Sequence, residues 1–233
     1  MARLRAPHLL LSGAASVVLV VAGCSLPDYG PMKTAQRTYS VAGTVGALSA
    51  TTHGGDIEIV PVDGGGPVRV TEKYRYNDRK PSPAHTVKDG RLTLKAAECG
   101  MGRRCEVDYR VLLPRTAAVD LRTSGGDITL RGTRGAITAE TSGGDVKATD
   151  CAARSVRAKT SGGNVDLTMA AAPDEVSGRT SGGNVTIRLP KGSYAVDAST
   201  SGGHRKVAVP VDGRSAHKVT ARTSGGDVAV VTS

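Results

Sequence analysis

The sequence predicts an all-β protein: a parallel β-helix, or β-solenoid, with coils of roughly 20 residues. The tetrapeptide Thr-Ser-Gly-Gly occurs six times, beginning at Thr123, Thr141, Thr160, Thr180, Thr200 and Thr223. Apolar or small residues alternate with other residues on both sides of each copy, which is the period of a half-buried strand. The 233-residue chain contains 30 glycines and neither Phe nor Trp. Its interior is therefore expected to be thin and aliphatic.

Each Gly-Gly pair is expected to form a corner between two strands. The apolar positions change parity across the pair: Val119 and Leu121 precede the first copy, and Ile128 and Leu130 follow it. Paired glycines suit a corner because they reach positive φ at no steric cost and let stacked backbones approach closely. An antiparallel β meander of Gly-Gly hairpins would show the same pattern. In the solenoid, each unit is one turn and every strand lies on its counterpart in the preceding turn. We prefer the solenoid because identical residues recur at identical positions, which gives aligned columns when coils stack in register.

The N-terminal residues predict a lipoprotein. Arg3 and Arg5 precede an apolar run over residues 9–21, and Val21-Ala22-Gly23-Cys24 matches a lipoprotein cleavage box. The run is too short to span a bilayer and fits a secretory signal. We therefore expect a signal peptide over residues 1–23, lipidation of Cys24 and a tether over residues 24–38. The β-solenoid domain is expected over residues 39–233.

Within that domain the sequence predicts two regions. Residues 39–120 are expected to form longer, less regular coils, and residues 121–233 to form the regular Thr-Ser-Gly-Gly repeats. Val68–Tyr76 alternates cleanly between apolar and polar residues and reads as a strand. The following segment, residues 80–89, contains Pro81 and Pro83 and is expected to project as a loop.

Three cysteines remain after Cys24, and outside the cytoplasm they can oxidise. Cys99 and Cys105 flank a glycine-containing segment between two strand-like runs, so we expect a disulfide between them. A metal site would need further ligands nearby, and the segment offers none. Cys151 is left over, either as a free thiol or as an intermolecular link.

The residue after each Gly-Gly pair is polar: Asp56, Asp127, Asp145, Asn164, Asn184, His204 and Asp227. We interpret these residues as turn-edge residues, because calcium-binding β-roll repeats have a nine-residue period with further Gly and Asp. Asp166, Asp174 and Glu175 come nearest to an acidic cluster, and the histidines lie apart without a nucleophile motif. The sequence therefore predicts no catalytic residue, no metal and no cofactor.

Charge gives the remaining clue to function. The net charge is +10, and the residues that precede the six tetrapeptides are Arg122, Glu140, Lys159, Arg179, Ser199 and Arg222. Stacked coils would align them into a mostly basic row that attracts polyanions. Arg122, Lys159, Arg179 and Arg222 are therefore candidate polyanion-binding residues. The alternative is a solvated face without a ligand.

Several of these motifs resemble those of a known family. The lipobox, the segment Gly54–Val60, the run Val70–Lys73 and the repeated Thr-Ser-Gly-Gly units are similar to the bacterial putative-adhesin family of β-strand-repeat lipoproteins. The resemblance covers residues 39–233. It implies a right-handed β-helix outside the cytoplasm, with no assigned reaction and no catalytic residues.

We therefore expect a lipid-anchored, extracytoplasmic module that is non-catalytic and adhesin-like, with a binding or structural role at the cell envelope. The expected partners are the membrane, through lipidated Cys24, and an anionic cell-wall polymer or another envelope protein. Specific nucleic-acid recognition is not expected. The alternatives are a polysaccharide-active β-helix enzyme and an accessory protein in cell-envelope stress signalling. An enzyme would need clustered acids in a groove, whereas a polyanion binder would need a continuous basic face.

Overall fold

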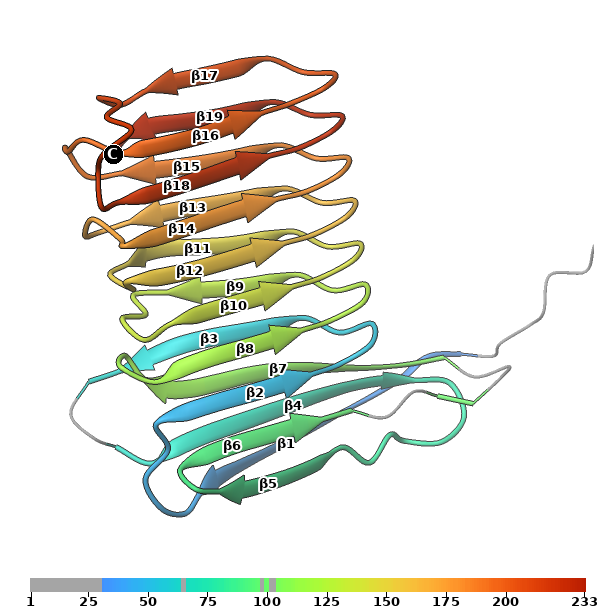
Figure 1. Ribbon diagram of the computed structural model, residues 1–233. Helices are drawn as coiled ribbons and strands as arrows, with labels where there is room; N and C mark the ends of the chain where they lie inside the picture. The colour runs from blue at the N-terminus through green and yellow to red at the C-terminus, as the bar shows by residue number, and fades with distance from the viewer. Residues whose placement is uncertain (1–30, 64–65, 97–98, 101–103) are drawn as a thin grey trace, which may run out of the picture.

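The computed structural model describes residues 31–63, 66–96, 99–100 and 104–233. These residues form a stack of short strands arranged in two facing sheets (Figure 1). The described residues contain 19 strands and no helix, which confirms the all-β prediction. The expected signal peptide and Cys24 lie outside the described residues.

The ten-stranded sheet, called sheet A, has the following spatial order: β1 (Lys33–Val41), β4 (Val68–Tyr76), β7 (Cys105–Pro114), β3 (Ile57–Val62), β9 (Ile128–Arg131), β11 (Val146–Cys151), β13 (Val165–Met169), β15 (Val185–Leu189), β19 (Val228–Thr232) and β17 (Arg205–Ala208). The nine-stranded sheet, called sheet B, has this order: β5 (Ala84–Lys88), β6 (Arg91–Lys95), β2 (Ala47–Thr51), β8 (Ala118–Arg122), β10 (Ile137–Glu140), β12 (Ser155–Lys159), β14 (Glu175–Arg179), β18 (Lys218–Arg222) and β16 (Ala195–Ser199).

Every Thr-Ser-Gly-Gly corner joins a strand of sheet B to a strand of sheet A. The first corner, for example, links β8 to β9, and β8 pairs in parallel with β2 and β10 instead of with β9. The Gly-Gly hairpin alternative is therefore wrong at these corners. We call two strands joined by such a corner a rung. Equivalent residues of neighbouring rungs lie in register, as Val119, Ile137, Val156 and Val176 do.

The rungs do not stack in the order of the sequence. The last rung, β18–β19, lies between β14–β15 and β16–β17 (Figure 1). In the same way β2–β3, although early in the chain, lies next to β8–β9. The expectation that each strand lies on its counterpart in the preceding turn is therefore wrong at both ends of the stack. As a consequence, the last two strands of the chain, β18 and β19, have neighbours on both sides, whereas β16 and β17 are edge strands.

The N-terminal region is partly antiparallel. Strand β4 pairs antiparallel with β1 and β7, and β5 pairs antiparallel with β6. Because β1 begins at Lys33, residues 33–38 form part of sheet A, although the sequence placed them in the tether. Ala84–Lys88, expected in a projecting loop, forms the edge strand β5 of sheet B. All five residues of β5 are exposed, so its sequence lacks the alternation that identifies a half-buried strand.

The core is the narrow space between the two sheets. It is filled by aligned columns of Val, Ile, Leu and Ala, as the composition predicts. Three tyrosines are exceptions to this aliphatic pattern: Tyr74 and Tyr109 in the N-terminal region, and Tyr194 beside the C-terminal rungs, are all fully buried. The space between neighbouring strands, about 4.8 Å, sets the distance at which side chains of one column follow each other.

Candidate functional site

The Thr of each corner connects its own rung to the next one. Its hydroxyl donates to the carbonyl oxygen of the second glycine in the neighbouring rung, at 2.7–2.9 Å in all six repeats. The same hydroxyl accepts from the backbone N–H of the second glycine in its own rung. The Thr therefore satisfies two backbone groups where the chain leaves one sheet for the other, which explains its recurrence in structural terms.

The two glycines of a corner have different roles. A Cβ on the second glycine would lie 2.1 Å from a backbone carbonyl oxygen of the neighbouring rung, as at Gly144 against Gly126. A Cβ on the first glycine, such as Gly143, would meet nothing closer than 3.6 Å. Neither glycine has a positive φ, so the expected conformational reason for this pair is wrong. Close approach between stacked backbones requires only the second glycine.

The polar residues after the Gly-Gly pairs form a continuous ladder on sheet A. In each step a side-chain oxygen accepts the backbone N–H of the equivalent residue in the next rung, at 2.6–3.1 Å. The ladder runs through Asp108, Asp56, Asp127, Asp145, Asn164, Asn184, Asp227 and His204. The N–H of His204 holds the pKa of Asp227 below its usual range. No group of three metal-ligating side chains occurs in the described part of the chain. These contacts fit the turn-edge interpretation.

The candidate polyanion-binding residues lie in one column on the outer face of sheet B. The register aligns Arg122, Glu140, Lys159, Arg179, Arg222 and Ser199, in that order. Because β18 lies beside β14, Arg222 follows Arg179 directly and Ser199 comes last. Lys159, Arg179 and Arg222 therefore occupy three successive rungs. We call Arg122, Lys159, Arg179 and Arg222 the basic row.

Members of the basic row differ in their partners. Arg122 lies 3.2 Å from carboxylates of both Asp120 and Glu140, and Arg222 contacts Asp197. Lys159 and Arg179 have no carboxylate at ion-pair distance among the described residues. They line a hollow of about 300 Å³ together with Glu140, Arg157, Glu175 and Ser177. In this hollow the Arg157 guanidinium pairs with Glu175 at 2.9 Å. Two exposed cations, neither within ion-pair distance of a carboxylate in the described part of the chain, thus lie side by side in a hollow that Glu140 and Glu175 also line.

The acidic residues and histidines that a catalytic site would need are dispersed. Asp166 pairs with Arg188, Asp174 with Arg154, and Glu175 with Arg157. Of the histidines, His85 stacks on the ring of Tyr39 and His217 contacts the carbonyl oxygen of Pro173 through Nδ1. Each of these groups is thus engaged in a local contact of the fold.

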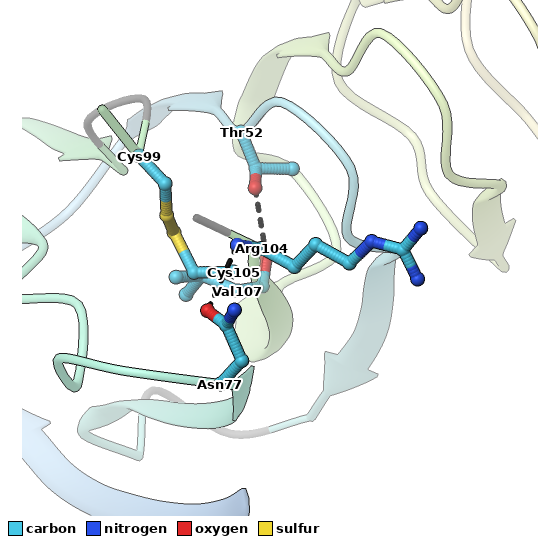
Figure 2. The surroundings of a disulfide bond; sticks show 6 residues. All are labelled: Thr52, Asn77, Cys99, Arg104, Cys105 and Val107. Atoms are coloured by element: carbon cyan, nitrogen blue, oxygen red, sulfur yellow. Dashed lines mark hydrogen bonds between the residues drawn. A yellow bond between two sulfur atoms is a disulfide. The ribbon is translucent and has the colours of Figure 1, made fainter. Parts of the chain in front are cut away.

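A disulfide joins Cys99 and Cys105, with a Cα–Cα distance of 5.9 Å. Figure 2 shows it beside the start of β7, where the side chain of Asn77 accepts the backbone N–H of Arg104 at 2.9 Å. Cys151 is a free cysteine and is fully buried, and burial raises the pKa of its thiol. Its position in the core leaves no access for an intermolecular link.

The sequence did not predict a polar cluster that is buried in the N-terminal region. Glu72 of β4 has no exposed surface and accepts hydrogen bonds from the hydroxyls of Tyr39, at 2.9 Å, and Tyr74. Burial and the neighbouring carboxylate raise the pKa of both tyrosines. The hydroxyl of Tyr109, also buried, has no partner among the described residues. A signal was present in the sequence, because Glu72 shares the parity of Val68, Val70 and Tyr74, which face inward.

These features define a class of protein: a two-sheet β-solenoid with repeated polar corners and a basic column along one face. The family model for Toastrack DUF4097 matches residues 42–231, and the chain belongs to that family. No curated protein matches the chain at a significant level. No helix among the described residues is long and apolar enough to cross a membrane.

Several solved structures are similar to this chain at low sequence identity. A putative cell adhesion protein from Clostridium sporogenes is 12% identical, with 86% of this chain and 100% of that chain covered and a TM-score of 0.46. A putative adhesin from Bacteroides fragilis is 15% identical, with 86% and 97% covered and a TM-score of 0.47. A putative adhesin from Parabacteroides distasonis is 12% identical, with 85% and 97% covered and a TM-score of 0.31.

Proposed function

We propose that the protein is a lipid-anchored, extracytoplasmic adhesin-like module that binds an anionic cell-envelope polymer along the basic row and catalyses no reaction. The observation that carries this proposal is the pair Lys159 and Arg179. They lie directly opposite each other in the register of β12 and β14. Like charges at such positions destabilise a sheet, and a bound anion between them would remove that repulsion.

The geometry of the row favours a linear polymer over a small anion. Successive cations recur at the rung spacing of about 4.8 Å along the stack axis. A chain that carries phosphate or carboxylate groups along its length can therefore contact Lys159, Arg179 and Arg222 one after another. Arg222 also contacts Asp197, so a polymer contact there competes with an existing ion pair.

The proposed location rests on the N-terminal sequence and on the disulfide. Disulfides persist mainly in oxidising environments outside the cytoplasm, which agrees with export by the predicted signal peptide. Lipidation of Cys24 would hold the module at the membrane, with the stack extending toward the polymer. A single short lipid group binds membranes weakly, whereas the two chains of a diacylglyceryl group anchor stably.

The binding proposal is tested by retention on an immobilised polyanion. We compare Lys159→Gln/Arg179→Gln with a control, Arg131→Gln/Lys147→Gln, which removes the same charge from the outer face of sheet A. The first variant should elute from lipoteichoic-acid resin at a clearly lower salt concentration than the control. Salt weakens such contacts because the Debye length is about 8 Å at physiological ionic strength and shorter above it. Co-elution of both variants would show that net charge alone explains retention.

The anchoring proposal needs a separate experiment. Cys24→Ser should abolish incorporation of labelled fatty acid and move the protein from the detergent phase to the aqueous phase in detergent phase separation. An unchanged distribution between the phases would refute lipidation at Cys24. The two tests are independent, because purified protein can bind the resin whether or not it carries the lipid.

A further inference from the structure

The C-terminal end of the stack has two open strand edges. Among the described residues, β16 pairs only with β18 and β17 pairs only with β19 (Figure 1). On the outer side, Tyr194, which directly precedes β16, bonds to Pro210 and Asp212, so the open edge consists of β17 and of β16 itself, Ala195–Ser199. The outer edge of such a strand offers backbone donors and acceptors to any other chain that can add a strand. Both sheets end at the same level, so this surface is two strands wide.

The apolar interior also reaches this end. Val196, Ala198 and Val207 occupy the inward columns of the last rung, in register with Val219, Ala221 and Val230 of the rung below. The residues of the lower rung are buried, whereas those of the last rung are only partly buried. The end therefore combines open backbone edges with apolar side chains that are only partly buried.

Arg205 lies across this opening. It is in register with Val228, in the inward column that Val146, Val165 and Val185 occupy in lower rungs. Its Nε donates to the carbonyl oxygen of Ala198 in the opposite sheet, at 2.8 Å. The carbonyl of Ser199 points into the stack, where it accepts from Thr223, so the carbonyl of Ala198 points to the open side. Arg205 thus spans the gap between the sheets and occupies an acceptor of the open edge.

We infer that Arg205 closes a surface that would otherwise pair with the same end of a second copy of this chain. The partner follows from strand geometry. Strands β16 and β17 run in opposite directions, so a twofold axis parallel to them places β17 of the second copy antiparallel to β16, and the reverse. β16, beyond the bonds of Tyr194 to residues 210–212, then faces β17 of the second copy, and the two apolar ends meet. With Arg205 in place, such pairing would bury two guanidinium groups without carboxylates and take away the acceptor of each.

The test compares three variants of the mature protein in a nonionic detergent by sedimentation equilibrium. Arg205→Val should form a dimer, whereas the wild type stays monomeric. Lys206→Val is the matched control, since it removes the same charge from the adjacent residue of β17, which points outward, and it should stay monomeric. Arg205→Val/Val207→Asp should return to the monomer, because a charge again lies at the open end.

Four results would overturn the inference. These are a monomeric Arg205→Val at every concentration, a wild type already dimeric through this end, equal dimerisation of Lys206→Val, and an Arg205→Val that forms open-ended aggregates. The last result counts against the inference because twofold pairing uses up both edges and stops at two copies. A cooperative melting transition of Arg205→Val, as in the wild type, establishes that the dimer is made of folded chains.

Discussion

The regular rungs, β8 to β19, and the N-terminal region, β1 to β7, satisfy their polar groups in different ways. In the regular rungs the Thr hydroxyl and the Asp or Asn side chain bond to backbone groups of the neighbouring rung, and the Thr hydroxyl also accepts the N–H of the second glycine in its own rung. Each rung repeats the same contacts, so the same residues recur. In the N-terminal region the side chains of Tyr39, Glu72 and Tyr74 bond to one another. Backbone-directed contacts thus produce a repeat, whereas side-chain-directed contacts produce a unique cluster.

The rung β2–β3 lies at the boundary between the N-terminal region and the regular rungs. It shows whether a corner depends on a neighbouring glycine or only on a neighbouring backbone. Its corner has Thr52 and Gly55 at the usual positions, but its neighbour on one side is β7, which has no Gly-Gly corner. Thr52 still donates to a backbone carbonyl, that of Val107, at 2.8 Å. A Cβ on Gly55 would lie 2.1 Å from the same oxygen. The corner therefore needs a backbone carbonyl one strand spacing away, and the residue that carries this carbonyl does not have to be a glycine.

The largest expected effect comes from the second glycine of a regular corner. Gly144→Ala forces a Cβ to within 2.1 Å of the Gly126 carbonyl oxygen, so two rungs must separate. We expect a loss of about 4 kcal/mol or failure to fold, since backbone cannot move aside as a side chain can. Urea unfolding measures the change in free energy.

Gly143→Ala is the matched control for this experiment. Its Cβ would be in ordinary contact, and the change should alter stability by less than about 1 kcal/mol. Similar losses in the two variants would mean that conformational freedom, and not close approach, explains the glycine pair.

The next effect tests the N-terminal cluster. Glu72→Ala leaves the hydroxyls of Tyr39 and Tyr74 without their acceptor in a buried site. Because hydrogen bonds to charged groups are strong and buried donors are costly to leave unpaired, we expect a loss of about 3 kcal/mol. Hydrogen exchange should speed up in β1 and β4 while β13 stays protected.

The control for Glu72 is Glu58→Ala. Glu58 is an acidic residue of the same region that pairs with Arg110 at the surface, at 3.1 Å. Such exposed pairs contribute about 1 kcal/mol or less. If exchange accelerates evenly through all rungs of Glu72→Ala, the two regions unfold as one unit and the comparison between them fails.

The sequence predicted the stack and its corners because each rung must solve the same backbone problem. It did not predict the order of rungs, since Val196 and Ala198 match Val219 and Ala221 equally well in either order. One signal for that order was present. Among the regular rungs, only β16–β17 has a cation, Arg205, at the first inward position after the corner, where the others have Ile or Val. The terminal repeats of a solenoid usually differ from the consensus in this way. The buried position of Glu72 was missed because the alternation in Val68–Tyr76 indicates an ordinary half-buried strand and does not single out one inward polar residue.

The smallest expected effect concerns the Thr hydroxyl, which both regions use. Thr160→Val keeps the shape of the side chain but removes its bonds to the Gly144 carbonyl and the Gly163 N–H. We expect a loss of about 1.5 kcal/mol by urea unfolding, because two backbone groups lose a partner. Thr52→Val should lose a similar amount if the corner contact is the same on both sides of the boundary. Thr168→Val on the outer face of β13 is the control and should change little. A loss at Thr52 far below that at Thr160 would show that the regular rungs depend on hydroxyl contacts that the N-terminal region does not need.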